Sequence, residues 1–143
     1  MINKTKNRVA AGFSLIELLI VLVILGMLGG LVGPRLFTQV DASKVDVAET
    51  QVRMLKTAIQ AYRLDNGMYP DDNTGLQALV RRPPEIETWN GPYLEEILPS
   101  DPWGNDFVYQ SRASNFQGFA LYSYGADGEE GGEGLNADIG FLP

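Results

Sequence analysis

The feature that most constrains this chain is a long apolar stretch close to its amino end. The 21 residues from 13 to 33 read FSLIELLIVLVILGMLGGLVG and contain a single charged residue, Glu17. As an α-helix they would extend about 32 Å, at roughly 1.5 Å per residue. The hydrocarbon core of a bilayer is about 30 Å thick. We therefore expect residues 13–34 to form a membrane-spanning helix.

The distribution of charge predicts how that helix is oriented. Lys4, Lys6 and Arg8 lie within the first twelve residues, which contain no acid, whereas the whole chain has a net charge of −7. Basic segments flanking a membrane helix stay in the cytoplasm. Residues 1–12 are thus expected to be a cytoplasmic leader and the acidic remainder to lie outside. The acidic balance also disfavours nucleic acid as a partner.

An ordinary secretory signal peptide is the main alternative for this region, and it would release a secreted calcium-binding module. The apolar run is longer than the roughly 7–15 residues of a typical signal peptide. The segment GLVGPR at residues 30–35 is also a poor match to a small-x-small cleavage site. The mature amino terminus distinguishes the two interpretations, because a signal peptidase would leave a start after Gly33.

Glu17 is the most informative residue of the stretch. A charged side chain at the bilayer centre costs about 2.5–3.5 kcal/mol on insertion scales and usually has a partner. The apolar stretch contains no basic residue. Cleavage immediately before Phe13 would create an α-amino group, which is the nearest cation available to Glu17. This reasoning connects Glu17 with the Gly12–Phe13 bond.

The hexapeptide GFSLIE at residues 12–17, between a basic leader and an apolar run, resembles the signature of type IV pilins and pseudopilins. The resemblance implies that a prepilin peptidase cuts between Gly12 and Phe13 in the bacterial inner membrane and N-methylates Phe13. It also implies that Glu17 acts in assembly and that Pro34 is the helix-kinking proline of the family.

Helical periodicity continues beyond the membrane stretch. Apolar residues recur there at spacings of three and four, which is typical of one face of a helix. They are Val45, Ala48, Val52, Leu55, Ile59 and Tyr62. We expect residues 35–66 to continue the helix up to Asn66-Gly67, a plausible helix stop. The apolar stripe would face the rest of the chain or a neighbouring subunit.

Residues 67–143 are expected to form a small periplasmic head. Thr74 and Gln77 fit a capping box that opens a short helix to about Val80. The segment DPWG at residues 101–104 fits a β-turn, and residues 107–110 and 119–124 fit two short strands. The predicted fold class is α+β, with a long amino-terminal helix packed on a head that holds a short antiparallel sheet and a carboxy-terminal metal loop.

Four segments of the chain resemble the major pseudopilins of type II secretion systems. They are YRLDNGMYP at 62–70, GLQAL at 75–79, DPWGN at 101–105 and SYGADG at 123–128. This resemblance implies a structural subunit that polymerises into a pseudopilus and drives protein export across the outer membrane. The implied partners are other copies, minor pseudopilins, the prepilin peptidase and the inner-membrane assembly platform. A type IV pilin or a minor pseudopilin remains an alternative.

The segment DGEEGGEGLNAD at residues 127–138 contains five acids, four glycines and no base. The chain has no cysteine or histidine, so a metal would need oxygen ligands, which suit calcium or magnesium. The spacing does not match an EF-hand, and a disordered acidic tail remains possible.

The resemblance to major pseudopilins implies a calcium site in this loop. Asp127 and Asp138 match its acidic positions, and Asn136 stands where an aspartate is frequent. The carbonyl of Tyr124 is a plausible backbone ligand, and Glu133 competes with Asn136 for a place in the ligand set.

Catalysis is not expected. Without cysteine and histidine, thiol nucleophiles and histidine-based triads are excluded. An anchored hydrolase would have to use a carboxylate pair such as Asp71-Asp72 or Glu95-Glu96. Adjacent acids in turns are more often solvated surface.

Processing is the first property to test. Gly12 leaves the backbone before the scissile bond unencumbered, so replacing it with a bulky residue should leave the precursor uncut. Mass spectrometry of the membrane-bound protein should show methylated Phe13 as the amino terminus of the unmodified sequence. Normal maturation of the Gly12 variant would contradict the assignment.

Overall fold

A computed structural model describes residues 12–95 and 97–143, with the backbone alone for residues 33–39. The elements are α1 (Leu15–Asn66), η1 (Gly75–Leu79), β1 (Val108–Gln110), β2 (Ala120–Ser123), η2 (Gly134–Asn136) and β3 (Ile139–Phe141), where η denotes a 3-10 helix. The chain divides into two units, one ending at Gln39 and the other comprising Val40–Pro143. Lys4, Lys6 and Arg8 of the expected leader lie outside the described residues.

The first unit contains the amino-terminal part of α1. The N–H groups of Glu17 and Leu18 both donate to the carbonyl of Ser14, at 3.0 and 3.2 Å, so the helix begins directly after Ser14. Residues Leu15–Val32 have a mean hydropathy of 2.8, are long enough to cross a membrane, and have none of their residues buried. The expected apolar helix is therefore present, although it starts two residues later than Phe13.

The second unit is built around the later part of α1. Val52, Leu55, Ile59 and Tyr62 are buried together on one face of the helix, as the spacing predicts. An adjacent face is polar, and it includes the ion pair between Arg53 Nη2 and Glu49 Oε2 at 2.8 Å. The apolar stripe thus faces the head of the same chain.

The end of α1 agrees with the sequence, whereas the next turn differs from it. Gly67 has a positive φ of 74° and its N–H bonds to the carbonyl of Arg63 at 2.8 Å, which closes the helix after Asn66. Thr74 makes no side-chain cap, because its backbone is helical (φ −85°, ψ −29°) rather than extended. Asp71 Oδ1 instead accepts from the Thr74 amide and hydroxyl, both at 2.7 Å. These bonds lower the pKa of Asp71.

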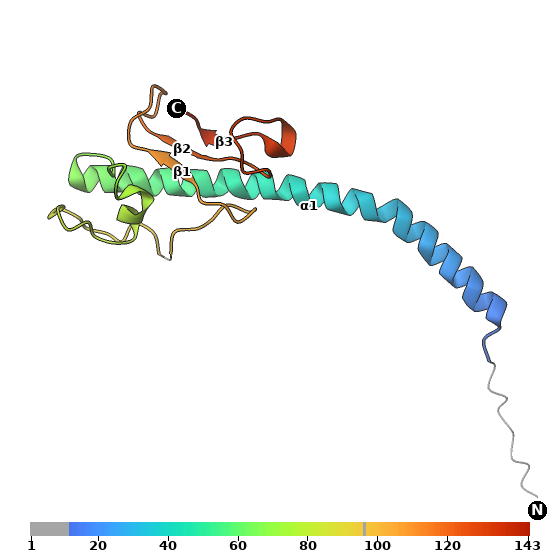
Figure 1. Ribbon diagram of the computed structural model, residues 1–143. Coiled ribbons are helices and arrows are strands. Elements are labelled where there is room, and N and C mark those ends of the chain that lie inside the picture. The colour runs from blue at the N-terminus through green and yellow to red at the C-terminus, as the bar shows by residue number, and fades with distance from the viewer. Residues whose placement is uncertain (1–11, 96) are drawn as a thin grey trace, which may run out of the picture. The chain divides into compact units, whose positions relative to one another are not determined.

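The sheet is antiparallel and three-stranded, in the order β1-β2-β3. Val108 pairs with Tyr122 and Leu121 pairs with Phe141. The central strand β2 is buried along its whole length, and the sheet lies alongside the later part of α1 (Figure 1). The strands expected at 107–110 and 119–124 are confirmed. The sequence did not predict β3. At Gly140 in this strand, an added Cβ atom would collide with the carbonyl oxygen of Leu121.

Burial along α1 provides a matched test of the core. Leu55 is 0% exposed and Leu64, on the same helix, is 86% exposed. Leu55→Ala should lower the free energy of unfolding by about 2–5 kcal/mol because it leaves a cavity in the core. Leu64→Ala should change it by less than about 0.5 kcal/mol. Urea denaturation of residues 35–143, followed by circular dichroism, measures both, and equal losses would contradict this packing.

Candidate functional site

A buried network of hydrogen bonds lies directly before the acidic loop in the chain. Asp101 Oδ1 accepts the N–H groups of Trp103 and Asn105, at 3.0 and 2.8 Å. Its other oxygen, Oδ2, accepts the hydroxyl of Ser123 at 2.5 Å, and the Ser123 oxygen accepts the N–H of Gly125 at 3.1 Å. The segments at 101–105 and 123–128 that the sequence singled out therefore meet in space. Asp101 and Ser123 are both buried, and their bonds hold the start of the loop.

The two ends of the loop are held together by backbone contacts. The N–H of Ala126 donates to the carbonyl of Leu135 at 2.9 Å. Gly125 has a φ of 72°, and a Cβ there would approach the carbonyl oxygens of Ala137 and Leu135 to 2.8 and 2.9 Å. Only glycine fits this crossing without displacing the backbone. The loop is therefore closed at its base, and four of its five acids are exposed while Asp138 is half-buried.

The two expected carboxylate ligands occupy different environments in this loop. Asp127 Oδ1 accepts the N–H of Glu129 at 3.2 Å, in an exposed turn. Asp138 Oδ2 accepts the N–H of Gly131 at 3.0 Å. Asp138 Oδ1 is buried and has no hydrogen-bond partner among the described residues. A buried carboxylate oxygen without a donor normally requires a partner, and a bound cation would supply one.

The other expected ligands are distributed around the same loop. Asn136 is exposed and ends η2, while Glu133 precedes η2 in an extended conformation without a side-chain cap. Tyr124 is half-buried and packs its ring edge-on against Tyr122, at 5.4 Å between centroids.

No three side chains of the histidine, cysteine, aspartate or glutamate types gather into a metal-binding group within residues 12–95 and 97–143. The expected set contains only two carboxylates, so amide and carbonyl oxygens would have to complete the coordination. Calcium accepts such mixed oxygen ligands, and the unpartnered oxygen of Asp138 fits this chemistry.

The acidic loop also influences the sheet beside it. The pKa of Tyr122 is raised to about 12, chiefly because the hydroxyl is desolvated. A hydrogen bond with Tyr124 and the negative charges of Glu130 and Asp138 raise it further. The negative charge of the loop thus affects Tyr122 on the central strand.

The carboxylate pairs considered for hydrolysis have structural roles where they are described. Asp71 caps the turn before η1, and Asp72 Oδ1 accepts the N–H of Ser111 at 2.5 Å. Glu95 is exposed, and Glu96 lies outside the described residues. Asp71 and Asp72 therefore hold backbone segments together.

The processing and assembly residues lie at the start of the first unit. Gly12 and Phe13 precede α1 and are exposed, so the expected scissile bond is in non-helical chain. Glu17 stands in the first turn of α1, where the positive end of the helix dipole favours a carboxylate. Pro34 lies within α1 and does not end it.

Comparison with known proteins extends these observations. Residues 35–141 match the family model described as "Type II secretion system (T2SS), protein G". Residues 7–33 match the model described as "Prokaryotic N-terminal methylation motif". The two matches follow one another along the chain. The methylation-motif match covers residues 7–12 of the expected leader and the exposed part of α1, and the protein G match covers the later part of α1 and the head.

Individual relatives agree over nearly the whole length. The type II secretion system core protein G of Pseudomonas aeruginosa is 45% identical over 138 residues, covering 94% of this chain and 96% of the relative. The Vibrio cholerae protein of the same name is 42% identical, with coverages of 94% and 93%. The crystal structure of the major pseudopilin from the type 2 secretion system of enterohaemorrhagic Escherichia coli matches with a TM-score of 0.58 and 31% identity. That match covers 74% of this chain and 92% of the crystallised one.

The comparisons and the fold agree on one assignment. The methylation-motif match includes the exposed apolar segment of α1, and the head carries an antiparallel sheet beside the packed part of that helix. The chain therefore belongs to the protein G family of the type II secretion system, the family of the major pseudopilins.

Proposed function

We propose that this chain is processed at Gly12–Phe13, resides in the inner membrane and polymerises into the pseudopilus as its major structural subunit. One observation carries the proposal. Residues 12–32 are all exposed in the isolated chain, and the segment Leu15–Val32 has a mean hydropathy of 2.8. Apolar surface is stabilised by about 25 cal/mol per Å² when it leaves water. This helix therefore needs lipid before assembly and neighbouring helices after it.

Processing, membrane residence and polymerisation each imply partners. Prepilin peptidase would remove the leader while the head lies in the periplasm, and the inner-membrane assembly platform would extract the mature subunit. Other copies would cover the apolar helix in the filament, and minor pseudopilins would complete it. The growing polymer would move exported proteins across the outer membrane, so the chain acts mechanically and not as an enzyme.

Glu17 provides the specific contact within this otherwise apolar core. Cleavage before Phe13 creates an α-amino group four residues away from Glu17 along the chain. In the filament, the carboxylate of one subunit would pair with the amino group of its neighbour, so that both charges are compensated. Removing one partner of a buried ion pair costs about 3–5 kcal/mol because the other charge remains buried.

Assembly should therefore depend on Glu17 while insertion should not. Glu17→Leu should enter the membrane and lose its leader normally, yet yield few filaments in shearing assays and electron microscopy. Leu18→Val, an apolar exchange in the same turn, is the matched control and should assemble. Abundant filaments from Glu17→Leu would count against the ion pair.

We also propose that the acidic loop binds calcium. Asp127 and Asp138 would supply carboxylates, Asn136 or Glu133 a side-chain oxygen, and Tyr124 a carbonyl. The unpartnered buried oxygen of Asp138 supports a cation at this place. Bound calcium would neutralise part of the loop's negative charge and hold the chain end against β2 without a disulfide, since the chain has no cysteine.

Thermal stability tests the calcium site. Saturating a folded-state site at 100 times Kd adds about 2.7 kcal/mol, which corresponds to a rise in Tm on the order of 10 °C for a domain of this size. Calcium should give this rise for residues 35–143, and magnesium should give much less. Asp127→Ala and Asp138→Ala should each remove most of the rise, whereas Glu130→Ala, an acid of the same loop, should retain it. An unchanged melting curve in the presence of chelator would show that the loop is a solvated tail.

A further inference from the structure

The hairpin between β1 and β2 presents an aromatic side chain to solvent. Phe116 is 100% exposed, although it is among the largest apolar side chains of the head. It therefore contributes nothing to the core described above. An aromatic ring left in water by the fold is a candidate for contact with another molecule.

The turn that carries Phe116 is firmly held. The side-chain oxygen of Asn115 accepts the N–H groups of Gln117 and Gly118, both at 3.0 Å. Its amide nitrogen donates to the carbonyl oxygens of Phe119 and Leu142, at 2.9 and 2.5 Å. Tyr69 donates its hydroxyl to the carbonyl of Gln117 at 3.2 Å, and Ser111 is bonded to Asp72 at the hairpin base. The ring therefore sits on a preorganised support, which reduces the entropy lost on binding.

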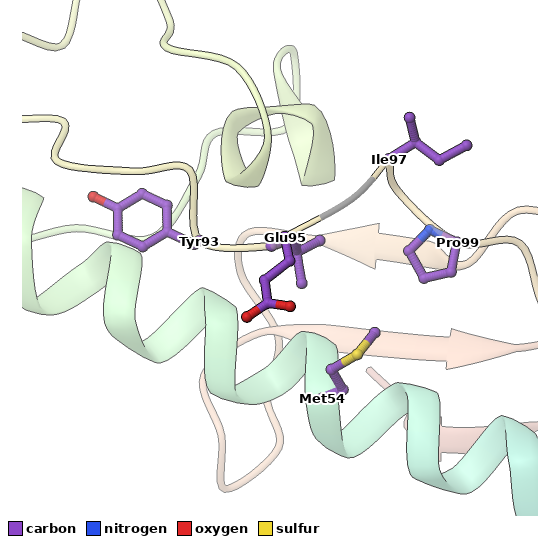
Figure 2. Close-up of a pocket in the computed structure, with 6 residues that line it drawn as sticks. Met54, Tyr93, Glu95, Ile97 and Pro99 are labelled. Carbon is purple, nitrogen blue, oxygen red and sulfur yellow. The ribbon is translucent and has the colours of Figure 1, made fainter.

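Elsewhere on the head is an apolar pocket of about 400 Å³. It is lined by Met54, Tyr93, Leu94, Glu95, Ile97 and Pro99. Figure 2 shows Met54 on α1 and the other labelled residues on the loop that runs beside that helix. Ile97 is 83% exposed, and Met54 is also exposed. The pocket is therefore open and apolar, and its described lining contains one acid, Glu95.

The hairpin and the pocket carry opposite charges. The hairpin segment 111–118 contains one charged residue, Arg112, and the described lining of the pocket contains Glu95. Both are exposed, and neither forms an ion pair with any residue that the structure describes. In Figure 1 the hairpin, coloured orange, lies on the sheet side of α1, and the yellow segment around residue 95 lies on the other side. One subunit therefore cannot bring its own hairpin to its own pocket without unfolding.

We propose that Phe116 of one subunit seats in the Met54–Ile97 pocket of a second copy of this chain, with Arg112 opposite Glu95. This inference rests on the proposed function, because it assigns a head-to-head contact within the filament. The two surfaces differ, so the contact is heterologous, and a heterologous contact that does not close into a ring generates an open helical assembly. Each added subunit would bring one hairpin and one pocket, and the contact would repeat along the polymer.

Cysteine cross-linking tests the contact directly, because the natural sequence contains no cysteine. The full chain carrying Ser114→Cys, at an exposed hairpin position that leaves Phe116 in place, together with Ile97→Cys, and produced in cells with the secretion system, should form a disulfide-linked ladder of multimers in the oxidising periplasm. The matched control pairs Ser114→Cys with Leu64→Cys, and Leu64 is 86% exposed. Its multimer yield should be lower by at least about tenfold, because Leu64 does not line the pocket that receives Phe116.

Charge reversal provides an independent measurement. Arg112→Glu and Glu95→Arg should each reduce the amount of sheared filament, and the double variant should restore most of it. Phe116→Ser should reduce filament yield by at least about tenfold, while leaving the Tm of residues 35–143 unchanged because its ring is outside the core. Leu64→Ser serves as the control for loss of an exposed apolar residue and should assemble normally.

The outcomes separate this contact from the function on which it rests. If the unmodified chain forms no filament, the proposed function fails and the contact fails with it. If filaments form, but Phe116→Ser assembles normally and both cysteine pairs cross-link equally, only the contact is overturned. A cross-linked band whose mass is not a multiple of this chain's mass would likewise overturn it and identify a different subunit as the occupant.

Discussion

The apolar surface that α1 leaves uncovered in its first part is the constraint on which the rest of the molecule depends. Folding of the isolated chain buries none of Leu15–Val32, so the free energy of covering this surface is available only to lipid or to other subunits. The same helix becomes amphipathic beyond Val40, where its stripe is covered by the head of its own chain. The single helix α1 thus combines a segment that its own head covers with a segment that only lipid or neighbouring subunits can cover.

The sequence predicts those features that depend on local pattern. The 3- and 4-residue spacing identified the buried stripe from Ala48 to Tyr62, and Asn66-Gly67 identified the helix end. Features set by distant contacts were missed. Strand β3 is three residues long with a glycine at its centre, so its identity depends on pairing with β2. The cap of η1 comes from Asp71 because the backbone of Thr74 is helical, which a residue pattern does not reveal.

The acidic loop illustrates the same division between local and distant information. Its composition predicts oxygen chemistry, and the resemblance supplies Asp127, Asn136, Asp138 and Tyr124 as ligands, an assignment that stays a prediction. The bond between Asp101 and Ser123 joins residues 22 positions apart and was not foreseen as part of this site. A buried carboxylate in a fully hydrogen-bonded network is costly to disturb. The loop therefore starts from a firmly hydrogen-bonded point, even though four of its five acids are exposed.

Helix packing and head contacts would perform different tasks in a filament. Apolar surfaces rich in leucine, isoleucine and valine attract one another strongly but without direction, so they define register poorly. The proposed ion pair at Glu17 would be satisfied at one axial position only, because a shift of either helix would leave two charges buried. This ion pair would not determine how the heads are rotated about the filament axis. A directional contact such as an aromatic ring on a hydrogen-bonded turn, inserted into a complementary pocket, would supply that rotation. Strong adhesion and defined geometry would then arise from different parts of one chain.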